Sequence, residues 1–191
     1  MGGLSGGIAQ ALAPFLPPPF VPIIAFASAI VLTGAIHIDG FLDTCDAAFA
    51  ALPRERRLEI LKDPHHGTFA IAYFGVAVAI WVAALFALPV GVLAQACAVC
   101  AGAARFGAIA SAVDRRPPPV ILAVNAVLLV GLALTLGACS EIIVGAVVIV
   151  AFLQSVVLRR TFGKLTGDMY GSIIVCGEIA ALVGFALLLR T

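Results

Sequence analysis

The most regular feature of the chain is a series of long apolar segments separated by short polar ones. An α-helix needs about 20 residues to cross a hydrocarbon core roughly 30 Å thick, and uncharged runs near this length recur along the chain. The runs are continuous rather than alternating, which favours transmembrane helices over β-barrel strands. The pattern predicts segments at about 4–16, 20–36, 68–88, 90–112, 119–138, 142–158 and 171–189.

The first two segments are separated by Pro17, Pro18 and Pro19, because proline cannot continue a helix. The segment at about 4–16 is short for a full crossing, and we interpret it either as a re-entrant piece or as the remainder of a longer helix. No internal repeat or low-complexity linker divides the sequence. We therefore predict one all-α integral-membrane domain over residues 1–191, a polytopic transmembrane helix bundle with about six or seven membrane segments.

Composition supports a membrane protein. The chain is 63% hydrophobic and 11% charged, with a mean hydropathy of +1.18, whereas soluble domains carry about 25% charged residues. The net charge of +1 and the lack of a basic stripe argue against a nucleic-acid partner. Four of the five cysteines lie inside apolar runs and are expected to be buried free thiols. Cys97 and Cys100 have the spacing of a CxxC motif but no second pair, so we predict no metal or redox site there.

The positive charges predict an orientation. If each segment spans the membrane, the loops at about 37–67, 105–118 and 159–170 share one side and hold ten of the eleven Lys and Arg residues, with Arg190 opposite. The positive-inside rule then places these three loops in the cytoplasm. The same side gathers eight of the ten acidic residues, so we expect the chemistry to occur there.

Three aspartates, Asp39, Asp43 and Asp46, follow the second segment closely. If residues 36–49 continue as a helix beyond the membrane surface, this spacing aligns the three side chains on one face. Carboxylates on one face repel each other unless a cation is present, and hard oxygen ligands suit Mg²⁺ or Mn²⁺. Because an acidic row embedded in apolar sequence is costly near a membrane, the pattern favours a metal site over a solvated helix end.

Two neighbours of this acidic row are candidate substrate contacts. Gly40 leaves room for the close approach of a phosphate or of another helix. His37 either caps the span at the membrane interface or hydrogen-bonds to a substrate, and the sequence favours neither interpretation.

A short amphipathic helix is predicted over residues 54–63, with its basic residues forming a charged interfacial face. The Asp63-Pro64 step ends this helix, and Gly67 permits a tight turn back into the next span. The adjacent His65 and His66 are a weak zinc signal, because neighbouring side chains point apart and neither a cysteine nor a third histidine is near.

A third polar cluster runs from Gly163 to Asp168, with Gly171 beyond it. It resembles a phosphate-binding loop that opens a helix, since backbone N–H groups at a helix N-terminus bind anions. The residue order of a P-loop is absent. A capped helix start after a basic loop explains the cluster equally well.

Taken together, these stretches resemble the cobalamin synthase family, the membrane-embedded adenosylcobinamide-GDP ribazoletransferases. The family pattern T-G-A-[LI]-H-x-D-G-[LF]-x-D-T-x-D is matched by residues 33–46. The pattern R-x-L-E-I-[ML]-[KR]-D-x-x-x-G-[TA]-[FY] is matched by residues 56–69, and G-x-x-T-G-D-x-x-G by residues 163–171, followed by Glu178. The order and spacing agree over about residues 30–185.

This resemblance implies an enzyme that joins adenosylcobinamide-GDP to α-ribazole or its 5′-phosphate. GMP is released, and adenosylcobalamin or its 5′-phosphate is formed. The implied cofactor is Mg²⁺, one ion or two, bound by Asp39, Asp43 and Asp46, with Asp63 as a further ligand or the base. The residues predicted to bind substrate or phosphate are His37, Gly40, Arg57, Lys62, Gly67, Thr166, Gly167 and Asp168.

The expected surroundings follow from the same assignment. The chain is predicted to lie in the plasma membrane of a prokaryote as a multi-pass protein with cytoplasmic active-site loops, in contact with the lipid bilayer and without nucleic acid. A homo-oligomer is compatible with the sequence. The family pattern also includes an earlier segment with an F-L-T-R-[LI]-P-like motif, and this chain begins at what resembles the Gly-rich helix that follows it.

A transporter or ion channel is the competing hypothesis, in which membrane acids carry cations. Transporters often contain inverted repeats and broken helices near the midplane, whereas here no repeat is visible and most acids fall in predicted loops. We expect no ion flux that depends on Asp43 when the protein is reconstituted in liposomes. Flux that depends on Asp43 in the absence of any nucleotide chemistry would favour the transporter.

Overall fold

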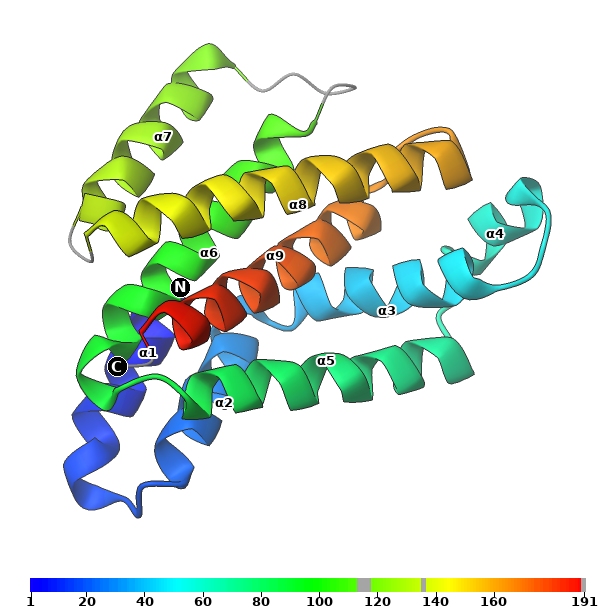
Figure 1. The fold of residues 1–191 in the computed structure, drawn as a ribbon. Helices are drawn as coiled ribbons and strands as arrows, with labels where there is room; N and C mark the ends of the chain where they lie inside the picture. Colours follow the sequence, from blue (N-terminus) through cyan, green and yellow to red (C-terminus); the bar gives the residue numbers. More distant parts are fainter. Residues whose placement is uncertain (113–117, 135–136, 190–191) are drawn as a thin grey trace.

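The computed structural model describes residues 1–112, 118–134 and 137–189, and every regular element in these ranges is a helix (Figure 1). The α-helices are α1 (Gly2–Leu12), α2 (Phe20–Thr33), α3 (Ile36–Phe49), α4 (Arg54–Ile60), α5 (Thr68–Phe86), α6 (Leu93–Ala110), α7 (Pro119–Leu134), α8 (Ala138–Phe162) and α9 (Gly167–Leu188). Two short 3-10 helices, η1 (Ala13–Phe15) and η2 (Val90–Val92), accompany them. The all-α prediction is confirmed.

Several of these helices are long and apolar enough to cross a bilayer. Within the described ranges they are four: Thr68–Phe86, Val90–Ala110, Cys139–Phe162 and Gly167–Leu188. Helices α2 and α3 make a fifth if the bent pair counts as one span, and Pro119–Gly131 is a shorter apolar helix. The chain is therefore a polytopic helical membrane protein. The segments predicted at about 4–16 and 119–138 are present as helices, but α1 with η1 and the apolar part of α7 are shorter than a full crossing.

Large apolar side chains cover the outside of the bundle. On α5, α7 and α8 they include Val76, Val127, Leu128, Phe152 and Val157, each more than half exposed. Such surfaces are rare on soluble monomers, whereas lipid tails are as apolar as these side chains. The outer helices are therefore suited to contact lipid.

Helix α9 lies in the middle of the bundle, in contact with α3, α5, α6 and α8 (Figure 1). Its side chains Met169, Ile173 and Phe185 are completely buried. Small residues allow α6 to approach closely, and a Cβ built on Gly177 would lie 3.1 Å from the Cβ of Ala104. Close packing of small residues is the usual means of helix association in membranes.

The chain turns sharply between α2 and α3. Gly34 and Ala35 both have left-handed backbone conformations, with φ of 60° and 57°, and the two helices are bent by 90° at this break. Left-handed residues end an α-helix because they reverse its handedness. A helix over residues 36–49 is therefore confirmed, but it is not a continuation of the segment predicted at 20–36, as we had supposed.

The described residues contain more helix than the sequence pattern predicted. The predicted segment at 90–112 and the predicted loop at 105–118 overlap, and the structure decides for the segment: α6 extends to Ala110, so Arg105 lies inside a helix. Helix α8 begins at Ala138, so the gap between the segments predicted at 119–138 and 142–158 falls in its first turn. The loop predicted at 159–170 shortens to residues 163–166. The predicted loop residues 113–117 lie outside the described residues.

The crossing of α3 and α9 is unusually close. A Cβ built on Gly40 would lie 2.5 Å from the carbonyl oxygen of Asp168, and one built on Gly171 would lie 3.1 Å from the carbonyl oxygen of His37. Gly40 was predicted to allow the close approach of either a phosphate or another helix, and in the structure the group that approaches it is helix α9. This contact brings the first turn of α9 against α3.

We predict that Gly40→Ala destabilises the protein by about 1–3 kcal/mol, because the added methyl group must displace the α9 backbone. The matched control is Gly75→Ala on α5, where an added Cβ meets no atom within 4 Å and alanine favours the helix by about 0.5–1 kcal/mol. Thermal unfolding in detergent, followed by labelling of the buried cysteines, measures both. Equal stability of the two variants would contradict the close crossing.

Candidate active site

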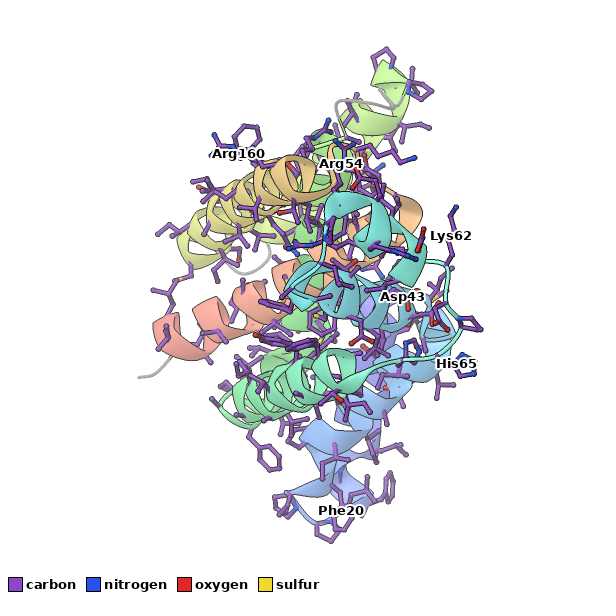
Figure 2. The ribbon with its side chains drawn as sticks, turned by 90° about the vertical axis from the view of Figure 1, so that its right-hand side faces the viewer. Phe20, Asp43, Arg54, Lys62, His65 and Arg160 are labelled. Atoms are coloured by element: carbon purple, nitrogen blue, oxygen red, sulfur yellow. The ribbon has the colours of Figure 1, made fainter. Side chains whose placement is uncertain are left out.

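Helix α3 carries the acidic row, and the exposure of its three side chains falls along the helix. The side chain of Asp39 is 65% exposed and that of Asp43 is 16% exposed, whereas Asp46 is buried. In Figure 2, Asp43, Lys62 and His65 lie on the same side of the molecule. The three aspartates therefore share one helix but not one environment.

Asp46 uses both carboxylate oxygens to begin α5. Oδ2 accepts a hydrogen bond from the Gly67 N–H, and Oδ1 accepts one of 2.9 Å from the Ala70 N–H. The first N–H groups of a helix have no partner within it, so a carboxylate there acts as a cap and also balances the helix dipole. Gly67 permits this contact, because a Cβ on it would lie 2.9 Å from Asp46 Oδ1. The sequence analysis did not anticipate this capping.

His66 is brought to the acidic row by the same contact. Its Nδ1 lies 3.3 Å from Asp43 Oδ1, and its Nε2 lies 3.8 Å from Asp39 Oδ1. From the sequence, His66 was a candidate only as half of a zinc pair, and its position beside the aspartates was not predicted. The sequence shows that His66 directly precedes Gly67. This would have indicated a place near the aspartates only if the hydrogen bond between Gly67 and Asp46 had been known.

Negative charge converges on Asp43 from two helices. The carboxylates of Asp39, Asp46 and Asp168 all lie close enough to act electrostatically on that of Asp43. Thr166, which precedes α9, donates a 3.4 Å hydrogen bond from Oγ1 to Asp168 Oδ2. Thus α3 and the start of α9, distant in sequence, form one acidic cluster: Asp39, Asp43, Asp46 and Asp168.

The cluster is not a ready-made metal cage. Among the residues that the structure describes, no three His, Cys, Asp or Glu side chains are arranged so that they could hold a metal ion by themselves. The residue types nevertheless suit a hard cation, which prefers carboxylate oxygen. Mg²⁺ in particular is often held by one or two carboxylates together with water and substrate phosphates.

Asp63 has a different set of contacts from the acidic cluster. Its Oδ1 accepts a 3.0 Å hydrogen bond from the His65 backbone N–H and lies 2.9 Å from His65 Nδ1. The hydrogen bond from the His65 side chain, followed by that from its backbone, holds the pKa of Asp63 below its usual value. A metal-binding or basic role for Asp63 stays a prediction.

The basic residues near the site mainly hold α4 in place. Arg57 donates from Nε to the Leu52 carbonyl at 2.8 Å and from Nη1 to the Ala48 carbonyl at 3.2 Å, close to the end of α3. The Arg54 guanidinium lies against Gly163, the left-handed residue that ends α8. Lys62 is exposed on the same side as Asp43 (Figure 2). Of the two basic residues predicted to bind phosphate, Arg57 and Lys62, the second therefore has the more accessible side chain.

The predicted phosphate-binding loop is the start of α9. Thr166 is the residue before the helix, Gly167 is its first residue, and Asp168 lies in its first turn. An added Cβ on Gly167 meets no atom within 4 Å, so the backbone there is open to a ligand. The structure brings this helix start to the acidic row, and the binding of a phosphate there stays a prediction.

An ion pair inside the bundle was not foreseen. Arg105 on α6 donates from Nη1 to Glu178 Oε1 on α9 at 2.7 Å, and both side chains are largely buried. Charged groups within membrane spans are rare and are usually paired. The partners are 73 residues apart, and the prediction of Arg105 as a loop residue hid the pairing.

These features define a class: a polytopic helical membrane protein with an acidic site built from two of its helices. A more specific assignment comes from family comparison, in which the model described as cobalamin-5-phosphate synthase matches residues 1–186. The chain belongs to this family.

Similar proteins are known in several bacteria. The adenosylcobinamide-GDP ribazoletransferase of Klebsiella pneumoniae (strain 342) is 30% identical over 200 residues, which cover 96% of this chain and 81% of the relative. The protein of the same name from Shigella flexneri is 30% identical over 203 residues, with the same coverage. That of Escherichia coli (strain K12 / DH10B) is 28% identical over 203 residues. No solved structure matches the chain at a significant level.

We predict that Asp46→Ala destabilises the protein by about 1–3 kcal/mol, because it leaves the N–H groups of Gly67 and Ala70 without their acceptor. Asp39→Ala, at an exposed position of the same helix, should change the stability by no more than about 0.5 kcal/mol. Thermal unfolding in detergent distinguishes them. If Asp39→Ala proved the more damaging change, the capping role of Asp46 would be wrong.

Proposed function

We propose that this chain is an adenosylcobinamide-GDP ribazoletransferase, which joins adenosylcobinamide-GDP to α-ribazole or its 5′-phosphate and releases GMP. The observation that carries the proposal is the convergence of Asp39 and Asp43 on α3 with Asp168 on α9. These residues belong to two separated motifs within a chain that matches the family model over residues 1–186. The reaction completes the assembly of adenosylcobalamin or its 5′-phosphate.

Mg²⁺ is the cofactor that this cluster suits. Asp39 and Asp43 are the first candidates to hold it, because Asp46 already accepts two backbone N–H groups. Asp168 is the additional carboxylate from α9, and Asp46 and Asp63 keep the metal-binding roles proposed from the sequence as secondary candidates. When bound, Mg²⁺ supplies neutralisation of the diphosphate charge and of the departing GMP.

The chain's own residues position the reaction. His66 lies 3.3 Å from Asp43 and 3.8 Å from Asp39, and it positions the start of α5 beside these two carboxylates. The open backbone at Gly167 and the exposed side chain of Lys62 are the first candidates to bind phosphate oxygens. Arg57 keeps this predicted role as a secondary candidate, because it already donates to two backbone carbonyls. Gly40 and Gly67 act indirectly, since each permits a close contact that positions an aspartate.

The proton of the attacking ribose hydroxyl has a nearby acceptor in this arrangement. A carboxylate of the acidic cluster that holds no cation can accept it, and with Asp39 and Asp43 on the metal this leaves Asp168. Asp63 is the alternative base, at the surface beside His65. In both cases phosphoryl transfer depends chiefly on positioning and charge neutralisation.

We also propose the orientation. The loops predicted at 37–67 and 159–170, which carry the site, and the loop predicted at 105–118 together hold ten of the eleven Lys and Arg residues. The positive-inside rule then favours the cytoplasm of a prokaryotic cell for all three. The nucleotide substrate then binds from the cytoplasm, the compartment in which nucleotides are made. A homo-oligomer remains compatible with this arrangement.

We predict that Asp43→Asn abolishes GMP release from adenosylcobinamide-GDP while the protein stays folded in detergent, because the variant loses the central charge of the cluster. Removal of Mg²⁺ with a chelator should silence the wild-type protein in the same assay, and added Mg²⁺ should restore it. Glu55→Gln on α4 is the control, since this exposed acid lies outside the cluster and should keep wild-type activity. Retained turnover in folded Asp43→Asn would overturn the assignment.

A further inference from the structure

Helix α8 has an exposed apolar face that runs along most of its length. The side chains of Ile142, Ile149, Leu153 and Val157 are each between 57% and 65% exposed. With 3.6 residues per turn, these four side chains project from one side of the helix. Because α8 is long and apolar enough to cross a bilayer, and lipid tails are as apolar as these side chains, this side of α8 faces lipid.

Arg160 continues the same face. From Ile142 to Arg160 the chain advances 18 residues, or five turns, so the two side chains project in the same direction. Arg160 is exposed and lies at the outer edge of the molecule in Figure 2. The rise between the two residues is about 27 Å, close to the roughly 30 Å of a hydrocarbon core. Arg160 therefore lies where lipid tails end and head groups begin.

Two further cations lie at this end of α8. Lys164 is exposed one residue after Gly163, and the Arg54 guanidinium lies against Gly163 itself. Among the residues that the structure describes, Arg54, Arg160 and Lys164 form no ion pair. A helix C-terminus carries only about half a negative charge, and Glu55, next to Arg54 on α4, adds one at most. The end of α8 therefore carries an excess of positive charge.

A basic helix end that continues an apolar, lipid-facing stripe fits an anionic phospholipid. The phosphate of such a lipid can accept charge-assisted hydrogen bonds from Arg160 and Lys164, while its acyl chains lie along the stripe. A zwitterionic head group carries its own ammonium group beside the phosphate, and these cations would repel it. A soluble phosphate or nucleotide has no acyl chain and would make no use of the apolar face.

We propose that the end of α8 is a binding site for an anionic phospholipid, with the phosphate on Arg160 and Lys164 and the acyl chains along the exposed face of the helix. Arg54 contributes charge only, because its guanidinium is held against Gly163. The three cations do not belong to the acidic cluster. The inference therefore goes beyond the proposed function and does not rest on it.

The test measures lipid binding directly. Purified protein is immobilised in dodecyl maltoside micelles and equilibrated with radiolabelled phosphatidylglycerol or phosphatidylcholine at the same mole fraction, without either substrate. We expect wild type to bind phosphatidylglycerol with an apparent Kd at least about fivefold lower than that for phosphatidylcholine. Arg160→Gln should weaken phosphatidylglycerol binding about fivefold, which is the usual contribution of one cation near an anionic lipid surface. Arg160→Gln combined with Lys164→Gln should weaken it by at least about tenfold.

Arg56→Gln is the matched control. Arg56 is an exposed cation on α4 whose charge is already balanced by Glu59 at 2.8 Å, so its loss should leave phosphatidylglycerol binding within a factor of two of wild type. Arg160→Lys keeps the positive charge and should also bind phosphatidylglycerol. Thermal unfolding verifies that each variant is folded. Lys164→Gln alone replaces Arg160→Gln if the latter does not fold, with the same expected loss.

Three results would overturn the proposal. The first is equal affinity of the wild-type protein for the two lipids. The second is an equal loss in Arg160→Gln and Arg56→Gln, which would mean that overall charge and not the end of α8 attracts the lipid. The third is displacement of phosphatidylglycerol by excess inorganic phosphate, which would identify a site for soluble anions.

Discussion

The close contact between α3 and α9 is the constraint on which the site depends. It exists because neither Gly40 nor Gly171 has a side chain, so that the backbone of one helix lies directly against that of the other. The contact places Asp168 beside an acidic row that precedes it by more than 120 residues. In a membrane, lipid tails are as apolar as the helix surfaces, so the hydrophobic effect does not drive helices together. Close packing of this kind stabilises their association instead.

A second set of polar contacts holds the remaining parts of the site around this crossing. The Asp46 carboxylate caps α5 and thereby brings His66 to Asp43, while Arg57 and Arg54 fasten α4 to the ends of α3 and α8. These groups are occupied in holding the structure together. Of the acidic cluster, Asp39, Asp43 and Asp168 are then available for chemistry.

Much of this was accessible from the pattern of residues, for local reasons. The apolar runs predicted a helical membrane protein, because a membrane span must satisfy its own backbone hydrogen bonds, and the spacing of Asp39, Asp43 and Asp46 predicted a shared helix face. Contacts with a distant partner were not accessible in this way. The pairing of Arg105 with Glu178 and the capping of α5 by Asp46 were both missed, because the partners lie more than twenty residues away and cannot be seen in local sequence.

The sequence by itself determined the membrane class, the acidic row and the family resemblance, since each depends on composition or on spacing along one segment. Only the tertiary structure decided the 90° turn at Gly34 and Ala35, the proximity of Asp168 to Asp43 and the pairing of Arg105 with Glu178. These features depend on how closely two helices approach and at what angle. That geometry is decided by contacts between residues far apart in the chain, which no local pattern records.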